Sequence, residues 1–158
     1  MRRIRVYVDT SVFGGTADVE FAAASRQFFD RVRAGDFVVM VSPVVVQEIA
    51  RAPSAVQDVL KELPKSAVVE VPATPDATAL AKAYIEAEII GEGRMADALH
   101  VALATVSGAD LILSWNFKHI VNYDRIHKYN GVNVLRGYPA IGIYSPLELA
   151  HGDENQDV

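Results

Sequence analysis

The sequence contains no cysteine, no internal repeat and no long apolar run. Without cysteine, disulfide bonds and thiolate metal sites are excluded. A membrane-spanning helix needs roughly 18 consecutive apolar residues, and no stretch reaches that length. Met1-Arg2-Arg3 leads into a short strand-like run rather than the apolar segment of a signal peptide. We therefore expect a cytoplasmic protein that does not associate with a membrane.

An excess of positive charge is also lacking, since 15 Lys and Arg face 20 Asp and Glu. Three of the acids, Asp153, Glu154 and Asp157, lie in the last seven residues, which we expect to be a disordered acidic tail (152–158). The other 151 residues are enough for one domain with a substantial core. Outside the tail, acids and bases nearly balance, so the surface could hold RNA through a local patch but not through a strong global field.

Strand-like and helix-like segments alternate along the chain. Short apolar, β-branched runs predict strands at 4–8, 37–41, 67–71, 111–113 and 140–144. Helical spacing, together with capping Ser, Pro and Gly residues, predicts helices at 17–33, 43–51, 53–63, 76–90, 95–107 and 116–129. Such alternation predicts an α/β fold, a three-layer α/β/α sandwich with a mainly parallel central sheet.

Four polar residues lie where the strands of such a sheet would end. Asp9 follows the first strand, and Glu48 lies in the helix after the second. Asp97 begins the helix that leads to the fourth strand, and Asn116 comes just after that strand. Sites in open α/β sheets form beyond the carboxyl ends of the strands. We therefore expect these residues to meet at one edge of the sheet.

Each acid also has a simpler explanation. Asp9 could satisfy a turn, Glu48 could lie at the surface, and Asp97 could owe its place to the helix dipole. Against this, Glu48 and Asp97 are set in helices that are otherwise largely apolar, where a lone carboxylate is costly. Two carboxylates ~4–5 Å apart repel by about 3–4 kcal/mol at an effective dielectric constant near 20. A hard cation relieves this, and all-oxygen ligands suit Mg²⁺ or Mn²⁺.

Four short motifs, in order, resemble those of PIN domains, in particular toxins of the VapC type. They are Val-Asp-Thr-Ser at 8–11, Ser-Pro-Val-Val-Val-Gln-Glu-Ile at 42–49, Ala-Asp-Ala-Leu-His-Val-Ala-Leu-Ala at 96–104 and Ala-Asp-Leu-Ile-Leu-Ser-Trp-Asn at 109–116. The resemblance implies Mg²⁺- or Mn²⁺-dependent cleavage of RNA by a toxin with a cognate antitoxin, and a homodimer. It implies that Asp9, Glu48 and Asp97 are the central acids, supported by Ser11 and Thr10.

The fourth position departs from the family pattern, which has an acid where this chain has Asn116. An amide oxygen can ligate a metal or hold a water but brings no charge, so the number of bound ions stays open. His119 lies one helical turn on and could supplement the site, but we favour a histidine at the surface or in contact with phosphate. His100 shares a helix face with Asp97 and could touch the site, but we favour a hydrogen-bonded core or interface position for it.

The segment from 116 to 136 carries an excess of positive charge. Lys118, His119, Arg125 and Lys128 are candidate RNA contacts, and Tyr123 and Tyr129 lie among these basic residues. Basic side chains interleaved with aromatic ones suit a single-stranded RNA path. An ordinary amphipathic helix with tyrosines in the core explains the same pattern.

Three functions follow from these observations. The first is a metal-dependent endoribonuclease, and the second is a catalytically weak or inactive module that binds RNA or a partner, for which Asn116 is the motive. The third is a phosphotransfer protein that uses Asp9. A receiver would need acids beside Asp9, and an aspartate-nucleophile phosphatase would need a second Asp where Ser11 stands, so the third fits poorly.

Overall fold

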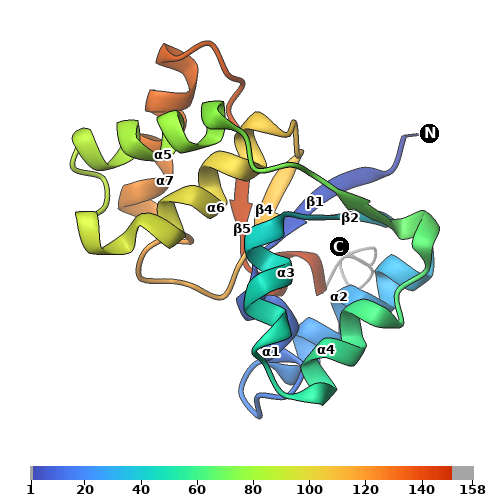
Figure 1. The fold of residues 1–158 in the computed structure, drawn as a ribbon. Helices are drawn as coiled ribbons and strands as arrows, with labels where there is room; N and C mark the ends of the chain where they lie inside the picture. Colours follow the sequence, from blue (N-terminus) through green and yellow to red (C-terminus); the bar gives the residue numbers. More distant parts are fainter. Residues whose placement is uncertain (1, 151–158) are drawn as a thin grey trace, which may run out of the picture.

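The computed structural model describes residues 2–150, which form a five-stranded parallel sheet with helices on both faces (Figure 1). The strand order is β3-β2-β1-β4-β5. The strands are β1 (Ile4–Val8), β2 (Phe37–Val41), β3 (Val68–Glu70), β4 (Leu111–Leu113) and β5 (Gly142–Tyr144). All neighbouring pairs run parallel. The predicted α/β/α sandwich with a parallel sheet is confirmed.

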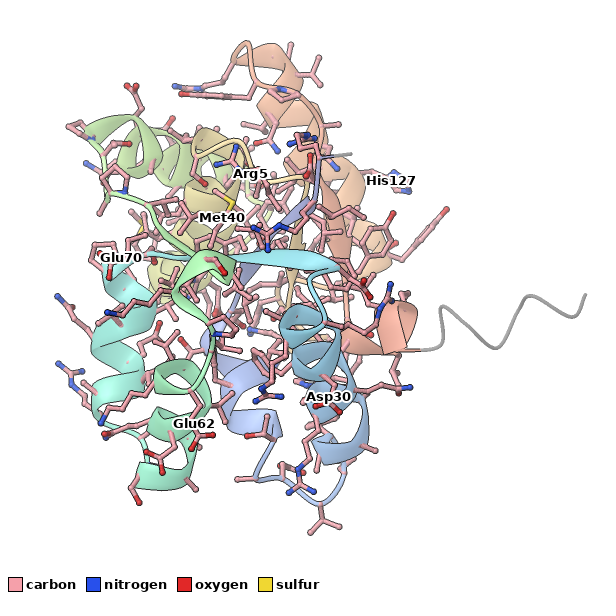
Figure 2. All side chains as sticks on the ribbon, turned by 90° about the vertical axis from the view of Figure 1, so that its right-hand side faces the viewer. Arg5, Asp30, Met40, Glu62, Glu70 and His127 are labelled. Atoms are coloured by element: carbon pink, nitrogen blue, oxygen red, sulfur yellow. The ribbon has the colours of Figure 1, made fainter. Side chains whose placement is uncertain are left out.

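The central strands are apolar because both of their faces are covered. Val6, Tyr7 and Val8 of β1 are completely buried, as are Ile112 and Leu113 of β4. These strands make up the middle of the core. Figure 2 shows the contrast between the core and the surface. Met40 of β2 lies inside, while the Asp30 and Glu62 side chains lie on the exposed outer surface.

Two groups of helices cover the sheet (Figure 1). The first group is α1 (Thr10–Gly15), α2 (Ala22–Arg33), α3 (Pro43–Ala50) and α4 (Ser54–Lys61), and α8 (Pro146–Ala150) packs on α2. The second group is α5 (Pro75–Glu86), α6 (Met95–Val106) and α7 (Tyr123–Leu135). The 3₁₀ turns η1 (Lys65–Ala67) and η2 (Glu92–Arg94) lead into β3 and α6. Right-handed crossovers explain this division of the helices. From β1 the chain moves outward through β2 to β3, and it then returns to β4 and β5 on the other side of β1. Because the direction of movement reverses, the connecting helices change to the opposite face of the sheet.

Local sequence signals set several helix ends. Ser42 caps α3 by accepting a hydrogen bond from Val45 N, and Pro43 occupies the first turn, as predicted. Thr74 caps α5 in the same way. Gly35 and Gly108, just after α2 and α6, have φ of +92° and +77°, the left-handed conformation that glycine adopts without strain at a helix C-terminus.

The helix predicted at 116–129 is wrong in its bounds. Residues 117–120 form turns, and α7 runs instead from Tyr123 to Leu135. The Asn116 side chain accepts a hydrogen bond from the backbone N–H of His119, which closes a turn rather than starting a helix. The helix predicted at 17–33 begins only at Ala22, and the short helix α1 between it and β1 was not expected.

Within residues 2–150, no helix has both the length and the apolar character needed to cross a membrane. The acidic tail predicted at 152–158 lies outside the described residues.

Candidate metal-binding edge

The candidate site lies where the order of the strands reverses. From β1 the chain proceeds outward to β2 and β3, and then crosses to β4 on the other side of β1. The crevice beyond the carboxyl ends of the strands at such a switch point is the usual ligand site of an open α/β sheet. Val8 and Leu113 are register partners at the ends of β1 and β4, and Asp9 N donates to Leu113 O at 3.0 Å. Asp9 therefore stands at the switch point itself.

Two serine hydroxyls hold the Asp9 carboxylate, which is 6% exposed. Ser11 Oγ and Ser114 Oγ donate to Asp9 Oδ2 at 2.9 and 2.7 Å. Each serine oxygen in turn accepts a backbone N–H, Ser11 from Trp115 and Ser114 from Asn116. The loop after β4 thus fixes the serines, and the serines fix Asp9.

Glu48 of α3 and Asp9 both lie next to the side chain of His100. His100 Nε2 donates to Glu48 Oε1 at 2.8 Å and lies 3.5 Å from Asp9 Oδ1. Thr10 Oγ1 also donates to Glu48 Oε1, at 3.2 Å. Asp9 and Glu48 therefore converge on one imidazole nitrogen.

Behind His100, a buried chain of hydrogen bonds connects three elements. His100 Nδ1 and the Tyr7 hydroxyl are 2.9 Å apart, and the Tyr7 hydroxyl shares a further hydrogen bond of 2.8 Å with Ser42 Oγ. Tyr7 belongs to β1, Ser42 caps α3 and His100 belongs to α6. Asp9 directly follows β1, Glu48 belongs to α3 and Asp97 belongs to α6. These hydrogen bonds therefore fix the relative positions of the three acids.

The charges around His100 shift several pKa values. The hydrogen bond from His100 is the main reason that the pKa of Glu48 lies below its usual value, although partial burial opposes it. Burial lowers the pKa of His100, but Glu48, Asp9 and Asp97 together raise it above its usual value. Burial raises the pKa of Tyr7, so its hydroxyl keeps its proton and can donate or accept.

Asp97, in the first turn of α6, is paired with Asn116. Asn116 Nδ2 donates to Asp97 Oδ1 at 3.2 Å, and Asn116 Oδ1 accepts from His119 N. Burial raises the pKa of the Asp97 carboxyl, and the nearby charge of Asp9 adds to this, while His119, His100 and Arg94 oppose it. A partly buried acid beside another acid is an electrostatically unfavourable arrangement that a cation would relieve.

The predicted RNA contacts lie on the segment that follows. Lys118 and Lys128 are exposed, whereas the Arg125 guanidinium donates to the backbone oxygens of Ile89 and Lys118. Both ring nitrogens of His119 are buried without a hydrogen-bond partner among the described residues. Burial and the charge of Arg94 lower the pKa of His119, against the opposing effect of Asp97.

The two tyrosines of that segment differ. Tyr129 belongs to the core, where it packs edge-on against Tyr84, and its hydroxyl donates to His119 O. Tyr123 is 78% exposed. Of these two tyrosines, therefore, only Tyr123 is available to RNA.

A sequence model of the PIN domain matches residues 6–120, almost three quarters of the chain. This chain belongs to the PIN domain family. Proteins of this family are generally nucleases, and they generally use divalent metals. The match includes Asp9, Glu48, Asp97 and Asn116. No curated protein matches the sequence of this chain.

Solved structures that share the fold of this PIN domain include the following two. One is VapBC2 from Rickettsia felis bound to a DNA fragment from their promoter, with 14% identity, a TM-score of 0.54, and coverage of 73% of this chain and 90% of that chain. The other is the Sarcin-Ricin loop cleaving toxin VapC20 from Mycobacterium tuberculosis, with 19% identity, a TM-score of 0.51, and coverage of 72% and 92%.

The donors of this PIN domain suit a hard cation. Within residues 2–150, no group of three or more His, Asp or Glu side chains is arranged so that it could hold a metal ion. Mg²⁺, however, is commonly held by one or two carboxylates and keeps several waters. Asp9 and Glu48, which converge, provide that number, and Asp97 adds a third acid nearby. The residues therefore fit a partly hydrated Mg²⁺ or Mn²⁺.

The sequence did not reveal the role of Ser114, and it favoured a core or interface position for His100, which is buried and also contacts the site. Ser114 directly follows β4, so its position beside Asp9 depends on β4 pairing with β1, which no local pattern shows. His100 had a usable signal, because it follows Asp97 by three residues on a helix that is otherwise buried. It contacts both Glu48 and Asp9.

Proposed function

We propose that this PIN domain is a metal-dependent endoribonuclease that acts as the toxin of a type II toxin–antitoxin pair. The observation that carries the proposal is the convergence of Asp9 and Glu48 on His100 at the switch point of a PIN fold, with Asp97 nearby. The likeness to the VapC toxin structures supports the fold, and through it the toxin assignment.

In this proposal, Asp9, Glu48 and Asp97 hold Mg²⁺ or Mn²⁺. When bound, the cation would lower the pKa of a water and neutralise charge that builds up on the phosphodiester. The chain's own residues set the positions of the acids. Ser11 and Ser114 orient Asp9, and Thr10 and His100 orient Glu48.

Asn116 is the fourth member of the proposed site. Its amide nitrogen holds Asp97, and its oxygen accepts from His119 N. To act as a ligand, this oxygen would have to turn toward the cation and give up that hydrogen bond. Asn116 therefore contributes to the site first by positioning Asp97.

Lys118, His119, Arg125 and Lys128 are the proposed contacts for the RNA backbone. The exposed Lys118 and Lys128 can reach phosphates, while Arg125 is partly engaged with backbone oxygens. These charges act locally, since the whole chain carries a net charge of −5.

The proposal also includes the partners of the protein. The Rickettsia felis structure is a complex of VapBC2 with promoter DNA. By analogy, we propose a cognate antitoxin and a homodimer for this chain, acting in the cytoplasm.

A second candidate function is binding of RNA or a partner without cleavage. It is favoured by the neutral Asn116 and by the lack of a complete three-ligand cage within residues 2–150. Metal-dependent cleavage of RNA distinguishes the nuclease from the binding module.

Cleavage of single-stranded RNA with Mg²⁺ or Mn²⁺, and with EDTA instead, tests the proposed function. We expect metal-dependent cleavage by the wild type, reduced at least about 100-fold in Asp97→Asn, since loss of an essential ligand or charge costs several kcal/mol. Asp76→Asn is the matched control, because Asp76 is an exposed acid in the first turn of α5. Unchanged cleavage by Asp97→Asn would show that Asp97 is not part of the site. If the wild type cleaves RNA with neither Mg²⁺ nor Mn²⁺, the binding module is favoured.

A further inference from the structure

A pocket of about 290 Å³ lies beside the proposed metal-binding edge. It is lined by Ser11, Gly14, Gly15, Asp18, Phe21, Trp115 and Asn116. Two of these residues also contact the acids, since Ser11 donates to Asp9 and Asn116 donates to Asp97. A group held in this pocket would therefore lie next to the acids.

One wall of the pocket is a pair of stacked aromatic rings. The Phe21 and Trp115 rings have centroids 4.3 Å apart and an interplanar angle of 24°. Trp115 Nε1 donates to the buried Ser25 Oγ at 2.8 Å, which fixes the indole ring. Gly15 makes this possible, because a Cβ there would lie 2.5 Å from Ser25 Oγ and 2.8 Å from Trp115 Nε1. The wall is thus aromatic and held in place; each ring covers one face of the other, and Trp115 is only 7% exposed.

The lining of the pocket disfavours a phosphate. None of the seven residues is cationic, and Asp18 contributes a carboxylate, which repels an anion. A flat, neutral ring with N–H groups at its edge suits such a lining better. It can pack against the part of these rings that the pocket exposes, while the Asp18 carboxylate and the Asn116 amide offer hydrogen-bond partners.

We propose that this pocket holds one unpaired nucleobase of the RNA, next to the phosphodiester that is cut. The inference rests on the proposed function and deepens it by giving the substrate a second point of recognition. Unpaired bases are the parts of RNA that proteins stack on aromatic side chains. The pocket therefore favours single-stranded segments over helical RNA.

Fluorescence of Trp115 measures occupancy of the pocket directly, because the chain has a single tryptophan. The full-length protein is titrated in EDTA, which prevents metal-dependent cleavage, with a short single-stranded oligoribonucleotide and with an abasic ribose-phosphate strand of the same length and charge. We expect the base-bearing strand to quench Trp115 and to bind about tenfold more tightly, the effect of one stacked base. The abasic strand should bind without quenching.

Gly14→Leu tests the pocket sterically. Gly14 lines the pocket, and a Cβ at this position meets no atom within 4 Å, so a side chain can enter without displacing the core. The variant should bind the two strands equally and show no base-dependent quenching. Phe117→Leu is the matched control, since Phe117 packs edge-on against Trp115 but does not line this pocket. It should keep the preference for the base-bearing strand.

Equal binding and equal quenching by the two strands in the wild type, or an unchanged preference in Gly14→Leu, would overturn the pocket assignment while leaving the nuclease proposal intact. Binding of neither strand by the wild type would also overturn the pocket assignment; the nuclease proposal is tested separately, by the cleavage assay with Mg²⁺ or Mn²⁺.

Discussion

At the scale of the residue, His100 links two of the acids of the proposed site. Its Nε2 contacts Glu48 and lies near Asp9, and the net effect of the surrounding acids raises its pKa. When His100 is protonated, its positive charge offsets the repulsion between the carboxylates. On the other side of the ring, Tyr7 pairs with Nδ1 in either protonation state, because a hydroxyl can donate or accept.

Tyr7→Phe removes only that hydroxyl. It leaves His100 Nδ1 without its buried partner, so we expect a loss of about 1–3 kcal/mol in the free energy of unfolding. Since the same ring orients Glu48, metal-dependent RNA cleavage should fall about 10- to 100-fold. Denaturant unfolding and cleavage assays measure the two effects. Tyr123→Phe is the control, because Tyr123 is largely exposed. Wild-type activity in Tyr7→Phe would show that the hydrogen-bond chain does not orient the site.

The sequence predicts the acids of this site better than their supports. Asp9, Glu48 and Asp97 stand out because a carboxylate is costly in apolar surroundings. The role of Ser114 depends on contacts between residues 105 positions apart in the chain. Short polar residues after a strand are too common in turns for such a contact to be recognised without the fold.

At the scale of the element, each acid depends on how one segment begins or ends. Asp9 directly follows β1, Glu48 lies in a helix capped by Ser42, and Asp97 lies in the first turn of α6. Strong signals such as Ser42-Pro43 allowed the start of α3 to be predicted correctly. The start of α7 was not predicted, because Asn116 forms a turn where a helix was expected. The hydrogen bond that closes this turn, from His119 N to the Asn116 side chain, has no distinctive sequence pattern.

Ser42→Ala and Thr74→Ala separate the capping of α3 from its role in the site. In each case the side chain accepts the N–H of the residue three positions on, at 3.3 Å, so each variant should lose about 1 kcal/mol of stability. Only Ser42 is also bonded to Tyr7. We therefore expect metal-dependent cleavage to fall several-fold in Ser42→Ala and to stay at the wild-type level in Thr74→Ala. Equal activity in the two variants would argue that Ser42 is a helix cap and nothing more.

At the scale of the whole molecule, the order of the strands creates the site. Periodicity shows which segments are strands and that they are buried on both faces, and it predicts the α/β class. It does not show that β1 lies between β2 and β4, which is what places Asp9 beside Ser114. A receiver domain of the flavodoxin type has the order 2-1-3-4-5, so the observed order argues against the receiver form of the phosphotransfer alternative.

The central claim is that the acids at this edge bind a divalent cation. Calorimetric titration of the metal-free protein with Mn²⁺ tests it most directly, with Asp9→Asn as the site variant and Asp124→Asn as the control, since Asp124 is exposed on α7. The account predicts saturable binding by the wild type and by Asp124→Asn, and affinity at least about tenfold weaker in Asp9→Asn. No binding by the wild type, or equal affinity in Asp9→Asn, would contradict it.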